Sequence, residues 1–155
     1  MKRSAAPELH LSNQLCFPLY AASRLVTRLY QPMLSPLGIT YTQYVVLLIL
    51  WEQSPCKVTD IGQRALLESS TLTPLLKRLE QLGLVRRQRD TIDERVVQVQ
   101  LTAAGEALRE RCRCVPTELM RKIDFPLERA NQIKGLLEEL IASLAAADVS
   151  AEPES

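Results

Sequence analysis

This chain of 155 residues has few histidines, few aromatic residues and almost no net charge. His10 is the one histidine, and 19 basic against 18 acidic side chains leave a formal net charge of +1. His10 with Cys112 and Cys114 falls short of the tetrahedral ligand set of a structural zinc site, so we expect no metal and no other cofactor. The balanced charge excludes a chain coated with basic residues. A nucleic-acid surface would therefore have to come from local clustering.

Long apolar segments are also missing. The longest apolar run, Val45 to Trp51, is far shorter than the roughly 20 residues that span a bilayer. The basic start of the chain is followed by Pro7 and Glu8 rather than by the apolar run of a secretory signal. The four cysteines lack the context of a secreted disulfide framework, so we expect thiols at rest. These absences favour a cytoplasmic protein.

Apolar residues, in contrast, are plentiful. They make up 46% of the chain, enough for one core at a length typical of a single domain. No internal repeat divides residues 1–155, so we interpret them as one unit. The segment 148–155 is small, polar and acidic, and we expect it to be a disordered tail.

Two helices are predicted before residue 52. Apolar residues at helical spacing from Leu15 predict the first, which should end near Met33. Thr40 with Gln43 three residues later predicts a capping box, in which each side chain bonds the backbone N–H of the other residue. This box should begin a second helix that continues through Trp51.

Two further helices are predicted between residues 57 and 83. Lys57-Val58 should be extended, and Thr59 should cap a short helix over 60–67. A leucine stripe predicts the next helix, with Pro74 tolerated in its first turn and Gly83 ending it in the left-handed conformation. The stripe comprises Leu72, Leu75, Leu76, Leu79 and Leu82.

The hydrophobic period then changes from helical to alternating. Apolar residues alternate with glutamines over 97–101 and predict a strand that pairs with 85–88 across a polar tip, 89–95. Thr102 should cap a helix to about Ile123, and Pro126 should open a last one. The last helix has an apolar stripe of Leu127, Ile133, Leu137, Leu140, Ile141 and Leu144. The predicted class is mainly α with a two-stranded β wing.

Two consecutive helices followed by a two-stranded ribbon have the layout of a winged helix-turn-helix, here over 40–101. Between Lys77 and Arg89 five cations accompany one acid. Charged faces are common on helices that bind nothing, but the ribbon adds Arg95, which suits a narrow minor groove, with Asp93 to orient it. The candidate DNA-binding residues are Ser69, Ser70, Thr71, Thr73, Lys77, Arg78, Arg87, Asp93 and Arg95.

Five segments in order give the chain a resemblance over residues 11–117. They are 13–17 (NQLCF), 38–44 (GITYTQY), 48–52 (LILWE), 71–80 (TLTPLLKRLE) and 93–95 (DER). Together these segments resemble the organic hydroperoxide resistance regulators, a subfamily of the MarR (multiple-antibiotic-resistance regulator) proteins. The last segment alone indicates only MarR proteins, whereas the early cysteine and the tyrosines after it indicate the peroxide-sensing branch.

The resemblance implies a homodimer held by helical regions 12–34 and 102–147. Such a dimer binds palindromic operator DNA as a repressor, not as an enzyme, until an organic hydroperoxide oxidises the early cysteine, which matches Cys16. Two tyrosines that match Tyr30 and Tyr41 of the partner support the thiolate, and Tyr20 lies one helical turn past Cys16. Phenol donors stabilise a thiolate, which is the form that attacks peroxide. Apolar neighbours would favour an organic peroxide: Leu15, Phe17, Leu47 and Trp51.

The residues alone leave several alternatives open. Without the resemblance, Cys16 would most often be a small buried hydrophobe. Pro18 departs from the family pattern, and two arrangements are open. At the first helical position, Pro18 would place Cys16 just outside a helix N-terminus, which favours a thiolate. In a helix that begins near Ser12, Pro18 would cause a kink. Cys112 and Cys114 are candidate resolving cysteines, and a low-molecular-weight thiol is the favoured alternative.

Cys56 is interpreted as a spacer thiol. Two other functions compete with redox sensing. A small aromatic or phenolic ligand in the dimer cleft would control a regulator for which Cys16 is incidental. A thiol peroxidase would need an arginine or threonine beside Cys16 to polarise the peroxide, and neither is spaced there.

Overall fold

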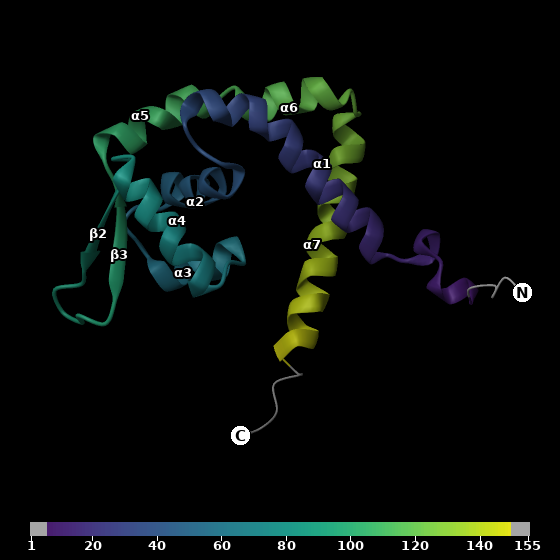
Figure 1. Ribbon diagram of the computed structural model, residues 1–155, viewed down its shortest axis with the longest axis horizontal. Coiled ribbons are helices and arrows are strands. Elements are labelled where there is room, and N and C mark those ends of the chain that lie inside the picture. The colour runs from purple at the N-terminus through teal and green to yellow at the C-terminus, as the bar shows by residue number, and fades with distance from the viewer. Residues whose placement is uncertain (1–5, 150–155) are drawn as a thin grey trace, which may run out of the picture. The chain divides into compact units, whose positions relative to one another are not determined.

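The computed structural model describes residues 6–149 and divides into two compact units, Met1–Val115 and Pro116–Ser155. In the first unit, α2, α3 and α4 lie together, and the hairpin of β2 and β3 extends from them (Figure 1). The helices and strands are α1 (Cys16–Leu34), α2 (Tyr41–Glu52), β1 (Cys56–Lys57), α3 (Val58–Ala65), α4 (Ser69–Gln81), β2 (Val85–Arg89), β3 (Val97–Leu101), α5 (Ala103–Cys112), α6 (Val115–Ile123) and α7 (Leu127–Val149). Short 3-10 helices cover Pro7–Leu9, Leu11–Asn13 and Ser35–Leu37.

The mainly helical winged fold is confirmed, but its sheet has three strands instead of two. The antiparallel order is β1-β3-β2, with Val85 opposite Leu101 and Arg89 opposite Val97. Cys56 lies opposite Val99 and thereby adds the third strand. Val58, predicted to be extended, is already the first residue of α3. A strand of two residues is too short to show an alternating pattern in the sequence.

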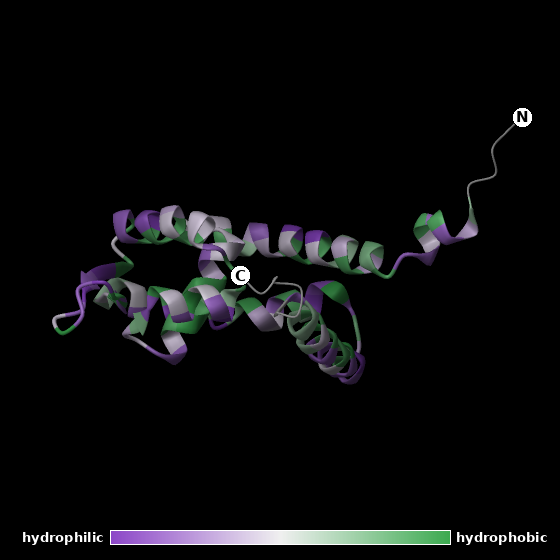
Figure 2. Cartoon of the chain, turned by 90° about the horizontal axis from the view of Figure 1, so that it is seen from below, coloured by the Kyte–Doolittle hydropathy of each residue, from purple (hydrophilic) through white to green (hydrophobic). Residues whose placement is uncertain are grey.

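The core of the first unit lies between α2, α4 and the sheet. Helix α2 is buried on most of its circumference, which explains why its sequence is apolar with little periodicity. Its side chains pack with those of α3, α4 and the strands. The hairpin that extends from this core is drawn mainly in the hydrophilic colour in Figure 2. The most deeply buried side chains are Leu34, Val46, Leu47, Leu50, Ile61, Leu72, Leu76, Leu79 and Val99.

Three helix ends confirm the sequence analysis. Gln43 Oε1 accepts a hydrogen bond from the Thr40 N–H (2.9 Å), and Thr40 Oγ1 accepts one from the Gln43 N–H (3.3 Å), which completes the capping box. Gly83 is left-handed, with φ 70°, and its N–H and that of Leu84 bond carbonyls of the last turn of α4. Thr102 caps α5 by accepting from the Gly105 N–H at 3.1 Å.

Other helix boundaries were predicted wrongly. Thr59 does not cap α3, which begins one residue earlier after Lys57. Pro74 lies inside α4, beyond its first turn, and leaves the Ser70 carbonyl without the usual backbone donor. The helix expected from Thr102 to Ile123 is broken after Cys112, because Pro116 has no N–H to continue the ladder.

Neither expected arrangement of Pro18 occurs. Cys16 is the first residue of α1, so Pro18 falls in the first turn, where its missing N–H breaks no intrahelical hydrogen bond. At the other end of the chain α7 reaches Val149, two residues into the segment expected to be disordered. Residues 150–155 lie outside the described part.

Among residues 6–149, none of the described helices is both long and apolar enough to cross a bilayer by itself. The segments Cys16–Leu37 and Tyr41–Glu52 pass only as a pair, and they are bent by 74° at the break between them. The second of these segments is α2, the buried core helix.

Candidate DNA interface and cysteine site

The exposed face of α4 carries most of the predicted DNA contacts. At about 100° per residue, Ser70, Thr73 and Lys77 lie on one face, and Leu72 and Leu76 lie on the opposite one. The leucines are buried, which holds α4 against the core and leaves the hydroxyls and the lysine in solvent. Helix α4 can therefore present these side chains to a groove without disturbing the core.

Other predicted contacts flank this face, and two residues on it were missed. Thr71 and Arg78 are exposed along one side, and Ser69 is exposed at the start of the helix. Pro74 and Gln81 project with the central residues, at spacings of four and eleven from Ser70. The helical period of the leucine stripe was sufficient to find them.

Arg87 was expected to contact DNA, but in the structure it is bonded within the chain. Glu80, on α4, accepts hydrogen bonds from the Arg87 backbone N–H (3.0 Å), Nε (3.0 Å) and Nη2 (2.8 Å). The side-chain and backbone hydrogen bonds from Arg87 lower the pKa of the Glu80 carboxyl below its usual value. This pair ties α4 to β2, so Arg87 positions the ribbon relative to the helix, and Lys77, Arg78, Arg86 and Arg89 stay exposed.

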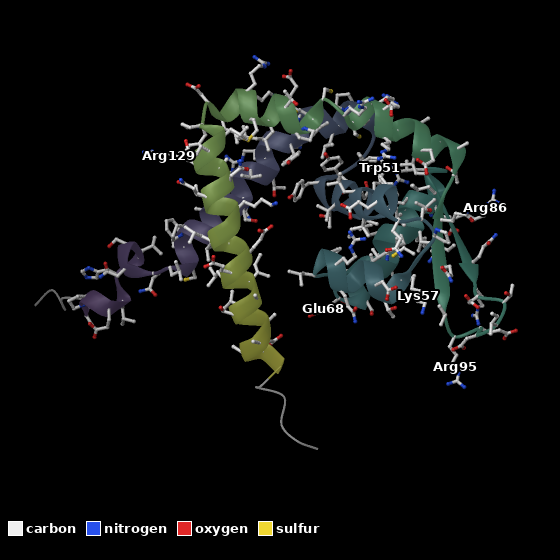
Figure 3. All side chains as sticks on the ribbon, turned by 180° about the vertical axis from the view of Figure 1, so that it is seen from behind. Trp51, Lys57, Glu68, Arg86, Arg95 and Arg129 are labelled. Atoms are coloured by element: carbon white, nitrogen blue, oxygen red, sulfur yellow. The ribbon has the colours of Figure 1, made fainter. Side chains whose placement is uncertain are left out.

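Arg95 is exposed in the hairpin tip. Figure 3 shows it at the far end of the ribbon, directed away from the rest of the winged unit. Asp93 was expected to orient Arg95, and its Oδ1 accepts a hydrogen bond from the Arg95 backbone N–H at 3.1 Å. The contact is therefore to the backbone of Arg95, while the guanidinium extends into solvent.

The four cysteines have different environments. Cys16 is exposed at the first position of α1, and Cys114 is exposed in the turn between α5 and α6. Cys56 and Cys112 are buried, and burial is the main cause that raises the pKa of each. Cys56, predicted to be a spacer thiol, is part of the core. Cys112, a candidate resolving cysteine, is a poor nucleophile as placed because its thiolate is disfavoured.

An aromatic cluster joins α1 to α2. The ring centroids of Tyr30 and Tyr41 are 4.8 Å apart, Tyr44 lies 5.8 Å from Tyr30, and Trp51 lies 6.2 Å from Tyr44. Burial and the neighbouring Tyr41 phenol raise the pKa of Tyr30, and burial first of all raises that of Tyr44 to about 12. Tyr44 was not named as a candidate, although its spacing of three from Tyr41 puts both on one helix face.

Cys16 does not reach these tyrosines within one chain. With a helical rise of about 1.5 Å per residue, the 14 steps from Cys16 to Tyr30 on α1 correspond to about 21 Å. Tyr20 is close in sequence but exposed, and its ring lies 5.5 Å from the Arg24 guanidinium. The expected apolar neighbours are also divided: Leu15 and Phe17 are exposed beside Cys16, and Leu47 and Trp51 belong to the core around α2.

A cleft of about 530 Å³ opens between α1 and the start of α2. Arg24 and Arg28 provide two cations, and Tyr41 provides an aromatic wall. Ser23, Thr27, Gln31, Leu34, Ser35, Ile39 and Thr40 complete the lining. The cleft suits a small anionic molecule with an aromatic ring. Over residues 6–149 no group of three or more His, Cys, Asp or Glu side chains is arranged to hold a metal ion.

Comparison with known proteins gives the same fold and the same kind of regulator. The MarR family profile matches residues 39–97. The chain is 43% identical over 136 residues to the organic hydroperoxide resistance transcriptional regulator of Bacillus subtilis, covering 88% of this chain and 92% of that protein.

Solved structures extend the likeness to a protein crystallised in several states. The overoxidized form of AbfR bound to DNA has a TM-score of 0.72 at 42% identity, and covers 88% of this chain and 94% of that one. AbfR of Staphylococcus epidermidis alone has a TM-score of 0.75 at 38% identity, with the same coverage.

A more distant structure is that of BpsR from Bordetella bronchiseptica, a protein whose DNA binding is regulated by 6-hydroxynicotinic acid. It has a TM-score of 0.76 at 25% identity and covers 84% of this chain and 95% of that one. Three observations indicate the same family: the winged unit with its exposed α4 face, the extended match to the Bacillus protein, and the likeness to these structures. The chain belongs to the MarR family of transcriptional regulators, and within it resembles the organic hydroperoxide resistance regulators.

Proposed function

We propose that this protein is a cytoplasmic, homodimeric repressor that binds palindromic operator DNA and releases it when an organic hydroperoxide oxidises Cys16. The observation that carries the proposal is the exposed Cys16 thiol at the start of α1, in a chain whose α4 face and Arg95 tip are both free for DNA. The likeness to AbfR, solved in an overoxidized form on DNA, supports the combination of redox chemistry with DNA binding.

The DNA-binding part of the proposal assigns α4 to the major groove. Hydroxyls of Ser70 and Thr73 reach base edges or phosphates, and Lys77 neutralises phosphate charge. Arg95 enters the adjacent minor groove, where the negative potential of a narrow groove favours a guanidinium. The hydrogen bonds from Arg87 to Glu80 keep α4 and the β2–β3 hairpin in one relative position, so α4 and Arg95 contact the DNA together.

The dimer part explains how the cysteine obtains its hydrogen-bond donors. Because Cys16 is about 21 Å from Tyr30 along α1, Tyr30 can donate to this thiolate only from a second chain. Tyr30 and Tyr41 are only half-buried and in contact with each other, so their hydroxyls are available for such a role. Two phenols donating to the sulfur favour the thiolate.

The redox step consumes one peroxide for each cysteine. The Cys16 thiolate attacks one peroxide oxygen, the O–O bond breaks, the released alkoxide takes a proton to become an alcohol, and the sulfur becomes a sulfenic acid. A low-molecular-weight thiol then displaces water and forms a mixed disulfide with Cys16. Burial of Cys112 supports this route over an intersubunit disulfide, although Cys114 is exposed. A hundredfold loss of DNA affinity corresponds to about 2.7 kcal/mol of coupling between the two states.

The test compares Cys16→Ser with Cys114→Ser as a matched exposed control. The Cys16→Ser dimer should bind operator DNA in a gel shift as the parent does and remain bound after cumene hydroperoxide, whereas Cys114→Ser should be released with the parent. Intact-mass analysis with an added thiol should show one adduct per parent chain. Release of Cys16→Ser to the same extent as the parent would contradict sensing by Cys16. Continuous consumption of peroxide would indicate a peroxidase instead.

The DNA contacts need their own variant. Arg95→Ala should weaken operator binding by about 1–3 kcal/mol, the usual range for a lost groove arginine. Arg113→Ala removes an equal charge from an exposed ion pair with Glu110, outside the proposed interface, and serves as the control. Equal operator affinity of Arg95→Ala and the parent would remove the ribbon from the interface.

The arginine-lined cleft favours a second candidate function. A small aromatic acid bound by Arg24, Arg28 and Tyr41 would shift the DNA-binding equilibrium without cysteine chemistry, and the likeness to BpsR supports that alternative. Calorimetric titration with 6-hydroxynicotinic acid or salicylate tests it. Binding that is lost in Arg28→Ala and that releases DNA from the Cys16→Ser variant would favour ligand control.

A further inference from the structure

The carboxylate of Asp90 holds the hairpin tip that carries Arg95. Asp90 directly follows β2, and its Oδ1 accepts hydrogen bonds from the backbone N–H groups of Ile92 (2.8 Å) and Asp93 (3.3 Å). Its Oδ2 accepts a third hydrogen bond, at 2.9 Å, from the side-chain amide of Gln98 on β3. One side chain therefore fixes the start of the tip and connects it to the opposite strand.

Further hydrogen bonds connect Asp90 to Arg95 through Asp93. Asp93, whose N–H is held by Asp90, accepts a hydrogen bond from the Arg95 N–H through its own carboxylate at 3.1 Å. Backbone hydrogen bonds from Asp90 N–H to the Val96 carbonyl (2.8 Å) and from Val96 N–H to the Asp93 carbonyl (2.9 Å) close the loop around it. The position of the Arg95 backbone thus depends, through Asp93, on Asp90.

All three strands contribute to the position of Asp90. Gln98 pairs with Lys57 on β1 and with Gln88 on β2. The hydrogen bonds from Gln98 and from the Ile92 and Asp93 backbones, with a smaller effect of the Lys57 charge, lower the pKa of Asp90 below its usual value. Asp90 is therefore ionised at neutral pH, in the part of the chain proposed to approach DNA.

A negative charge at that place has no direct electrostatic benefit, because DNA phosphates repel it. We propose that Asp90 is a positioning residue for DNA binding: it orders the hairpin tip before contact, so that Arg95 enters the minor groove without a loss of loop entropy. The inference rests on the proposed function, in which the Arg95 tip contacts DNA. An ordered tip binds more tightly than a mobile one because the ordering is already complete in the free protein.

The two effects of Asp90 have opposite signs, which makes the proposal testable. If the charge alone mattered, Asp90→Ala would tighten operator binding. If positioning dominates, Asp90→Ala loosens the tip and weakens binding by about tenfold, a loss within the range of a groove arginine. Asp90→Asn removes the charge but keeps an oxygen acceptor for the Ile92 and Asp93 N–H groups, and its NH₂ can donate to the Gln98 amide oxygen once that amide turns over, so it should bind at least as tightly as the parent.

Glu94→Ala is the matched control. Glu94 is an exposed acid beside Arg95 in the same tip, and among the described residues its side chain makes no hydrogen bond or ion pair. Removal of its charge should leave operator affinity unchanged or improve it. Affinities are measured by fluorescence anisotropy with a palindromic operator duplex at two salt concentrations, which separates a change in phosphate contacts from a change in tip order.

Hydrogen exchange of the DNA-free dimer supplies a second measurement. The Ile92 and Asp93 amides should lose protection in Asp90→Ala and keep it in Asp90→Asn, while the amides of α2 stay protected in both and show that the fold is intact. Unchanged operator affinity in Asp90→Ala, or equal weakening in Asp90→Ala and Asp90→Asn, would overturn the positioning role alone. Failure of the parent to bind any duplex would overturn the proposed function, and this inference with it.

Discussion

The winged region and α7 bury their apolar side chains to very different extents. Leu47, Leu50 and Leu76, on α2 and α4, are at most 1% exposed. On α7, Leu136 is 66% and Leu144 is 58% exposed. Both regions are helical and rich in leucine, so composition does not explain the contrast. The winged region completes its core from its own chain, whereas α7 has an apolar stripe that its own chain leaves in solvent.

This contrast separates two sources of stability. The winged region is stabilised by packing and by hydrogen bonds between its elements, such as the one from Trp51 Nε1 to the Gly105 carbonyl (3.0 Å). A helix of 23 residues with an exposed apolar stripe is typical of an interface, because water leaves that stripe only when another surface covers it. In the proposed dimer, that other surface belongs to the second chain.

The largest expected difference comes from one substitution placed in each region. A Cβ at Gly105 would overlap the Leu84 carbonyl oxygen, whereas one at Gly135 on α7 meets nothing within 4 Å of its own chain. Gly105→Ala should therefore destabilise the fold by about 3 kcal/mol, and Gly135→Ala should stabilise it by about 0.5–1 kcal/mol through helix propensity. Urea denaturation measures both. Similar destabilisation by the two variants would show that α7 is packed as tightly as the winged region.

A charge in the exposed stripe of α7 should act on assembly instead of folding. Ile141 is 48% exposed, so Ile141→Glu should leave the urea midpoint of the winged region unchanged but weaken dimerisation by about a hundredfold, or about 2.7 kcal/mol. Sedimentation over a concentration series measures the dimer, and Glu138→Gln on the same helix is the control. A dimer of parental strength in Ile141→Glu would exclude the stripe from the interface.

The smallest expected effect concerns acid. In the folded chain the bonds from Arg87 hold the pKa of Glu80 below its unfolded value, so the pair adds stability above the unfolded pKa of about 4.3 and loses it as the pH falls through the folded pKa. The parent should lose slightly more stability than Glu80→Gln between about pH 6 and about pH 3. The pair is about a third exposed, so the difference is small. Urea midpoints of both proteins across this pH range test the prediction. An equal loss of stability in the parent and in Glu80→Gln on acidification would contradict it.

Much of the fold was predictable where a local signal had one structural meaning. The Thr40 and Gln43 box, the left-handed Gly83 and the Thr102 cap each specify a helix end through groups a few residues apart. The break after Cys112 was missed although Pro116 marks it, because apolar residues keep helical spacing across it: Leu108, Cys112, Val115 and Leu119. The strand at Cys56 had no periodic signal because it is two residues long, and its partner Val99 lies far along the chain.

The candidate site was predictable in its residue types but not in its pairings. Helical spacing placed Lys77 and Thr73 on one exposed face. Nothing local in the sequence showed that Arg87 would bond Glu80, or that Asp90 would hold two backbone N–H groups and Gln98. Such contacts depend on how the ribbon meets the helix and on the turn of the tip, which tertiary structure determines.

The distance between Cys16 and Tyr30 on the single helix α1 has a consequence for genetic complementation. If each sensing site combines Cys16 of one chain with tyrosines of the other, a cell that makes both Cys16→Ser chains and Tyr30→Phe, Tyr41→Phe chains assembles mixed dimers with one complete site and one site lacking both parts. Two alleles that are each unresponsive alone should then restore a partial peroxide response together. Complementation between defective copies would be the genetic signature of a site divided between chains.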